Sequence, residues 1–177
     1  MKNSIRLTGL LALLLLTGNS ALAMFAAPPD EIWGKSDNGQ YEFRRDNTTG
    51  TLTIYKTGDR ESALWKAVLP DFSSLFSVTL LSDSGNTLIH LRGNQQVKTL
   101  KDTAVQVAKK DGSMAILPAE TFIDELSKPN GPMLGSSPRF LWLSSFGDFD
   151  DTQFSLTNAN GDKKEILLKD LDFKPES

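Results

Sequence analysis

The sequence contains no cysteine and a single histidine, His90. Without cysteine the chain cannot form a disulfide framework, use a thiolate nucleophile or carry a lipid on an N-terminal cysteine. One histidine falls short of the usual zinc and copper ligand sets, and no Gly-x-Ser-x-Gly segment presents a serine to it. The sequence therefore marks no catalytic, cofactor-binding or metal-binding residue.

The chain also lacks an excess of positive charge, with 19 lysine and arginine residues against 22 aspartate and glutamate residues. Removal of residues 1–23, which contain Lys2 and Arg6 and no acidic residue, gives a net charge of −5 (17 − 22). Nucleic-acid binding requires a clustered basic face, and adsorption to anionic lipid requires basic segments. We therefore expect neither of these partners.

Residues 1–23 have the three parts of a secretory signal peptide: a basic start, an apolar stretch over residues 10–16 and a small-residue end. The apolar stretch is too short to span a bilayer. We expect cleavage between Ala23 and Met24 and no stable membrane anchor afterwards. The mature protein would be periplasmic or secreted, with 154 residues (177 − 23), a length that suits one domain.

The mature chain has the pattern of short strands joined by turns rich in Asn, Asp and Gly. We expect an extended leader over residues 24–35 and a single β-rich domain over 36–177. The expected strands are 41–46, 51–56, 63–69, 76–81, 87–92, 104–108, 114–117, 140–146, 153–157 and 165–168. Pro118 suits a first helical turn, and Phe122 and Leu126 share a helical face. The pattern therefore predicts an all-β, mainly antiparallel fold with one short helix near 118–127.

Two segments, "SDNGQYEF" and "LSDSGNTLIHL", share a Ser-Asp-x-Gly turn that leads into a strand. An Asp side chain can accept hydrogen bonds from nearby backbone N–H groups, and Gly adopts the positive φ that such turns need. We expect positive φ at Gly39 and Gly85, which stand 46 residues apart (85 − 39). This spacing is typical of β-propeller blades.

These turn-and-strand segments, with "GTLTIYKTGDRESALWKAVL" between them, resemble WD40-like periplasmic β-propeller repeats over about residues 36–117. The resemblance implies blade-like antiparallel sheets. The turns lack the proline of that family, and no Trp-Asp dipeptide ends a strand. The mature chain has room for three such units, whereas closed propellers typically have four or more. The expected architecture is a partial propeller or, as the alternative, an open β-sandwich.

His90 shares a strand face with Leu88, which favours a half-buried structural role over catalysis. Trp65 and Trp142 lie in apolar strands and are expected to fill the core. An exposed tryptophan, for which Trp33 is the remaining candidate, would instead stack on a sugar ring or anchor a partner.

Acidic and amide side chains gather in two segments near the C-terminus, "GDFDDTQ" and "NANGD". Their oxygen atoms suit calcium, but neither segment has the order of ligands that a calcium loop requires, so we expect turns. The side chains concerned are Asp148, Asp150, Asp151, Asn158, Asn160 and Asp162.

The sequence favours an exported β-rich binding or structural protein that contacts another protein through an exposed sheet edge. Lys109 and Lys110 are expected to guard one edge. The alternative is an envelope hydrolase that uses a carboxylate pair such as Asp148 and Asp150. Enzymatic activity is left undecided by these patterns, and no cofactor is implied.

Overall fold

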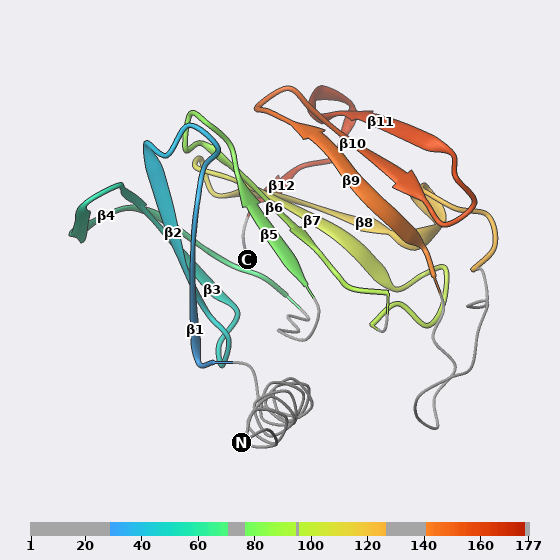
Figure 1. Ribbon diagram of the computed structural model, residues 1–177, viewed down its shortest axis with the longest axis horizontal. Coiled ribbons are helices and arrows are strands. Elements are labelled where there is room, and N and C mark those ends of the chain that lie inside the picture. The colour runs from blue at the N-terminus through green and yellow to red at the C-terminus, as the bar shows by residue number, and fades with distance from the viewer. Residues whose placement is uncertain (1–28, 71–76, 95, 127–140, 176–177) are drawn as a thin grey trace, which may run out of the picture.

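The computed structural model describes residues 29–70, 77–94, 96–126 and 141–175 (Figure 1). The expected signal peptide, with its cleavage site between Ala23 and Met24, lies outside these ranges. Within them the chain forms mainly antiparallel strands arranged in three open sheets. The expected all-β fold class is therefore confirmed, and the arrangement fits an open sandwich.

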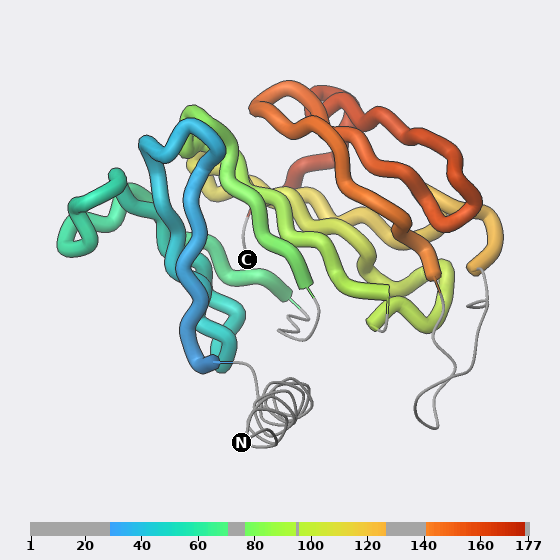
Figure 2. The backbone as a smooth tube through the Cα atoms, viewed as in Figure 1, coloured from blue at the N-terminus to red at the C-terminus, as the bar shows by residue number. Residues whose placement is uncertain are grey.

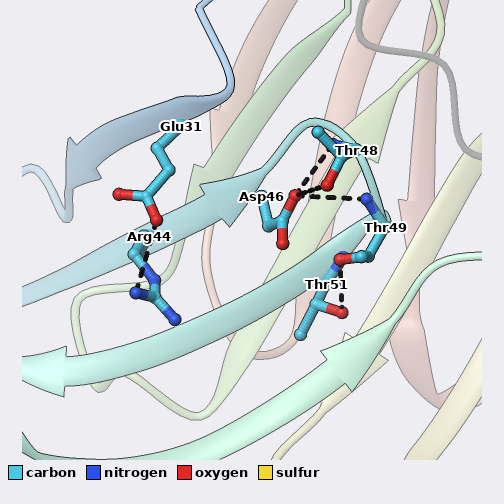
Figure 3. Close-up of polar contacts among 6 residues, drawn as sticks. All are labelled: Glu31, Arg44, Asp46, Thr48, Thr49 and Thr51. Atoms are coloured by element: carbon cyan, nitrogen blue, oxygen red, sulfur yellow. Dashed lines mark hydrogen bonds and ion pairs between the residues drawn. The ribbon is translucent and has the colours of Figure 1, made fainter.

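The first sheet has the strand order β1-β2-β3-β4. Its strands are β1 (Glu31–Lys35), β2 (Tyr41–Asp46), β3 (Thr51–Lys56) and β4 (Asp59–Val68). The turn between β2 and β3 is closed by Asp46, whose carboxylate accepts hydrogen bonds from the backbone N–H groups of Thr48 and Thr49 and from the Thr48 hydroxyl (Figure 3). The Thr48 hydroxyl and these N–H groups lower the pKa of Asp46 to about 2.

The second sheet has the order β12-β8-β7-β6-β5, and the third has the order β11-β10-β9. The strands of the second sheet are β5 (Val78–Leu81), β6 (Thr87–Leu91), β7 (Thr103–Lys109), β8 (Ser113–Pro118) and β12 (Lys174–Pro175). Those of the third are β9 (Leu143–Phe149), β10 (Gln153–Asn158) and β11 (Lys163–Leu167). All pairings in the three sheets are antiparallel.

The three sheets are stacked, with the second sheet in the middle (Figures 1 and 2). One apolar core contains Leu52, Ile54 and Trp65 of the first sheet together with Leu81 and Leu88 of the second. The other core joins the opposite face of the second sheet to the third sheet. Its largest side chains are those of Trp142, Phe122, Phe154, Ile89 and Leu156. Every residue of β6 is buried because both faces of the middle sheet are covered.

The two Ser-Asp-x-Gly turns make the same backbone hydrogen bonds. Gly39 N–H donates to Ser36 C=O, and Gly85 N–H donates to Ser82 C=O, both at 2.9 Å. The φ angles of the two glycines are 69° and 71°, so the expected positive φ is confirmed at both.

The role expected for the Asp of these turns is wrong. In each turn the side chain after the Asp accepts the local backbone N–H bond: Asn38 Oδ1 from Gln40, and Ser84 Oγ from Asn86. Asp83 reaches across to the other turn, where its carboxylate accepts from Asn38 N–H at 2.7 Å. The two turns are thus bonded to each other.

The structure corrects two further expectations and adds two short elements. Residues 31–35 of the expected leader form β1, which pairs with β2 along its whole length and places Gly34 against the ring of Phe43. The expected helix over 118–127 is only a 3₁₀ turn, η1 (Ala119–Thr121). Residues 122–126 leave the helical path, since the Phe122 carbonyl accepts a hydrogen bond from Asn158 Nδ2 instead of a helical N–H. A second such turn, η2 (Leu168–Asp170), and β12 were not expected.

Candidate binding groove

His90 lies fully buried on β6 between the first and second sheets, deeper than the half-buried position expected from the sequence. Its Nδ1 lies 3.0 Å from the hydroxyl of Thr79, which also accepts a hydrogen bond from Arg45. Burial, with the positive charges of Arg45 and Arg92, lowers the pKa of His90 to about 3. The imidazole is therefore neutral at physiological pH and serves as part of the interface between the sheets.

The three tryptophans have different environments. Trp65 and Trp142 are buried, and their indole N–H groups donate to the carbonyls of Gly85 and Arg92, so both expected core positions are confirmed. Trp33 is 37% exposed on the outer face of the first sheet. The guanidinium carbon of Arg60 lies 4.0 Å from the centre of its ring.

The expected turns form at residues 150–152 and 159–162, whereas Asp148 lies in β9, where its N–H donates to Ser155 Oγ. Asp150 accepts hydrogen bonds from the N–H and hydroxyl groups of Thr152 and from Gln153 N–H. These bonds lower the pKa of Asp150, and the bond from the Thr152 hydroxyl contributes most. A general acid for glycoside hydrolysis requires a raised pKa instead. Asn158 is buried, and its Oδ1 accepts from the N–H groups of Asn160 and Asp162.

A groove of about 520 Å³ lies where the end of β4 meets β8 and the C-terminal segment. Val68 and Ile116 line it and are 48% and 49% exposed, so two aliphatic side chains from different strands are open to solvent in one hollow. Pro70 forms part of the same wall and is held by the buried side chain of Gln106, whose Nε2 donates to the Pro70 carbonyl. The other lining residues are Met114, Ala115, Leu117, Asp172, Lys174 and Pro175.

The groove runs beside a strand edge that is only partly paired. β12 pairs with β8 at Ser113 and Met114. Beyond Met114, no described strand pairs with residues 115–118 on the side away from β7. An unpaired edge next to a half-exposed apolar side chain such as Ile116 is a surface that proteins usually cover or use for binding.

The sequence patterns did not predict this groove, although one of them pointed toward it. Met114, Ala115, Ile116 and Leu117 form an unbroken apolar run. A strand with one solvated face alternates apolar and polar residues, whereas an unbroken run indicates apolar surroundings on both faces. For Ile116 part of those surroundings is missing, since about half of its side chain is exposed.

A second, more polar hollow of about 550 Å³ surrounds Glu42 and Arg60 on the first sheet. Glu42 is 2% exposed and accepts two hydrogen bonds from Arg60, at 2.8 and 3.3 Å. The hydrogen bond from Arg60 lowers the pKa of Glu42 against the opposing effect of burial. Its charge is therefore already neutralised within the chain.

Comparison with protein-family models, with curated proteins and with solved structures finds no match to this chain. Among the described residues, His, Asp and Glu side chains nowhere gather in a group of three or more fit to hold a metal ion. No helix in the described ranges is long and apolar enough to cross a membrane.

Proposed function

We propose that the protein is an exported binding protein that holds an extended segment of another protein along residues 115–118 of β8. The observation that carries the proposal is the groove beside this stretch, where a partly paired strand edge meets the half-exposed side chains of Val68 and Ile116. Residues 115–117 can offer backbone N–H and C=O groups to an incoming strand, and Pro118 a C=O group alone. The groove offers apolar contacts to alternate side chains of that strand.

The pairing of β12 supports both the mode and the direction of binding. β12 lies antiparallel to β8, so this side of the strand accepts an antiparallel neighbour. In this register Phe173 and Asp172 approach β12 from the side of Ala115 and Ile116, so a partner segment opposite residues 115–118 lies against this part of the chain. At about 3.3 Å per residue, this stretch spans about 13 Å, which is enough for a short strand.

The charges around the groove favour an uncharged partner segment. Among the described residues that line it, Asp172 and Lys174 carry charge, and their side-chain atoms form an ion pair at 3.5 Å. These two charges offset each other, while Val68 and Ile116 present aliphatic surface. A segment that alternates aliphatic or aromatic residues with small polar ones matches this arrangement.

The test is selection of a displayed library of linear peptides on the immobilised mature protein. Affinities of the selected peptides are then measured calorimetrically for the wild type, Ile116→Lys and Leu167→Lys. Leu167 is a matched control because it is a 38% exposed leucine on β11 and does not line the groove. We expect alternating apolar peptides whose affinity falls at least about tenfold with Ile116→Lys, a loss of about 1.4 kcal/mol, and stays unchanged with Leu167→Lys.

Two results contradict the proposal: no peptide is enriched, or the selected peptides bind Ile116→Lys as tightly as the wild type. If a fatty acid or detergent occupies the groove and Ile116→Lys abolishes that binding while no peptide binds, the protein holds an apolar small molecule instead. Urea unfolding midpoints equal to that of the wild type for both lysine variants would show that the loss of binding with Ile116→Lys does not reflect unfolding.

Export rests on the signal-like residues 1–23. N-terminal sequencing of the protein from a bacterial envelope is expected to begin at Met24. Soluble protein that still carries residues 1–23 would contradict this part of the proposal.

A further inference from the structure

The C-terminal segment lies along the same side of β8 as the groove. β12 pairs at only two positions, Lys174 opposite Met114 and Pro175 opposite Ser113. Both residues of β12 are exposed. Pro175 also has no N–H group to donate to the ladder. Asp172, just before β12, lines the groove.

The C-terminal segment is held more firmly at its base, Leu168, than at its tip, Lys174 and Pro175. Leu168 is 2% exposed and belongs to the core between the second and third sheets. Leu171 and Phe173 are partly buried against the same core. Lys109 Nζ lies 3.8 Å from the centre of the Phe173 ring, so the first of the two lysines expected to guard an edge contacts this segment.

We infer that residues 171–175 form a strap that a partner segment displaces from β8. The inference rests on the proposed function, because the strap covers one end of the edge on which the partner would pair. A partner that extends beyond residues 115–118 would take the positions opposite Met114 and Ser113, where Lys174 and Pro175 now lie. The strap and the partner therefore compete for the same backbone groups of β8.

Because of this competition, the strap regulates the affinity of β8 for a partner segment. Only the fraction of molecules with the strap released can pair with a longer partner, so the apparent affinity is reduced by that fraction. Release of the strap lengthens the available edge from residues 115–118 to the whole of β8. Leu168, at the base, stays in the core during release and keeps the segment ready to return.

A reversible crosslink tests the inference. The chain has no cysteine, so Ser113→Cys/Pro175→Cys introduces its only two thiols. These positions lie directly opposite each other on neighbouring antiparallel strands, a placement that a disulfide can bridge. The probe is a selected peptide long enough to pair with residues 113–118, and we expect the oxidised variant to bind it at least about tenfold more weakly than the same variant after reduction. The control is Lys56→Cys/Asp59→Cys, an opposed pair on β3 and β4 away from the groove, for which oxidation is expected to change nothing.

Equal peptide affinity in the oxidised and reduced forms would overturn the strap and leave the proposed function standing. Alkylation of the single variant Ser113→Cys tests the strap without any peptide. Phe173→Ala, which removes the contact with Lys109, is expected to speed this alkylation several-fold, whereas Lys169→Ala on η2 is not. An unchanged alkylation rate with Phe173→Ala would overturn the strap even if no peptide bound the protein.

Discussion

Gly39 and Gly85 offer a direct comparison, because their backbone conformations match while their surroundings differ. Their φ angles are 69° and 71°. A Cβ atom added at Gly39 would meet nothing within 4 Å, whereas one added at Gly85 would lie 2.5 Å from Cδ1 and 2.6 Å from Cγ of Tyr41. We predict that Gly85→Ala destabilises the protein considerably more than Gly39→Ala does.

The expected magnitudes follow from these contacts. Alanine at positive φ costs about 1 kcal/mol in either turn. Gly85→Ala also forces the Tyr41 ring to move, and overpacking of this kind costs about 1–3 kcal/mol. Any shift of the Gly85 carbonyl weakens its 2.7 Å hydrogen bond from Trp65 Nε1, which is worth about 0.5–1.5 kcal/mol. The total is about 1 kcal/mol for Gly39→Ala and about 3 kcal/mol for Gly85→Ala.

Urea unfolding of the wild type and both variants measures these losses, provided that the slope m is unchanged. Combining Gly85→Ala with Tyr41→Ala tests the cause. If the ring is responsible, the double variant loses less stability than the two single variants together. Equal losses for Gly39→Ala and Gly85→Ala, or strict additivity with Tyr41→Ala, would refute the steric argument.

Two further predictions concern buried charges. Because the pKa of His90 is lowered to about 3 in the folded state, the unfolded state binds more protons between that value and about 6.5. The free energy of unfolding should therefore fall by up to about 1.4 kcal/mol per pH unit as the pH is lowered from about 6 to 5, a range in which few carboxylates titrate. His90→Gln should make the free energy of unfolding, measured by urea titration, less dependent on pH in this range. Arg60→Met should raise the pKa of Glu42, because it removes the hydrogen bond that lowers this pKa. Carboxyl NMR titration would measure the change, and Lys66→Met on the same strand should leave the pKa unaltered. An unchanged pKa of Glu42 with Arg60→Met would contradict the cause assigned here.

The parts of the fold that the sequence predicted are those controlled by local chemistry. β2 and β3 have the expected bounds, since the turn between them is closed by its own residues, Asp46 above all. The positive φ of Gly39 and Gly85 is likewise a property of each turn. Periodicity within a strand and turn residues at its ends are enough for this level of structure.

The parts that were missed depend on distant residues. β12 exists because the chain returns from the third sheet to the edge of the second, and nothing within Lys174 and Pro175 indicates that pairing. The groove has the same origin, since Val68 and Ile116 come from different sheets. Hydrogen bonds such as that from Asn38 to Asp83 join residues far apart in the sequence, and a single sequence does not report them.

The stack of sheets ends at the first sheet, whose outer face carries charged residues where the second sheet carries buried leucines. Lys35 lies opposite Glu42 in the first sheet, and Leu81 lies opposite Leu88 at the positions 46 residues later (81 − 35 and 88 − 42). The two leucines are buried in the core between the sheets. In the first sheet the same positions carry charges, and Arg60 covers Glu42.

The outer face of the third sheet is polar as well, since Ser155 pairs with Glu165 and Thr157 with Lys163 on the side opposite Phe154 and Leu156. A sheet face that is open to water carries polar side chains, as both outer faces here mostly do. The outer faces of both end sheets are therefore mainly polar, with single half-exposed apolar side chains such as Trp33 and Leu167. The edge of β8 differs from these faces, because it combines backbone that no described strand pairs with and a half-exposed apolar groove.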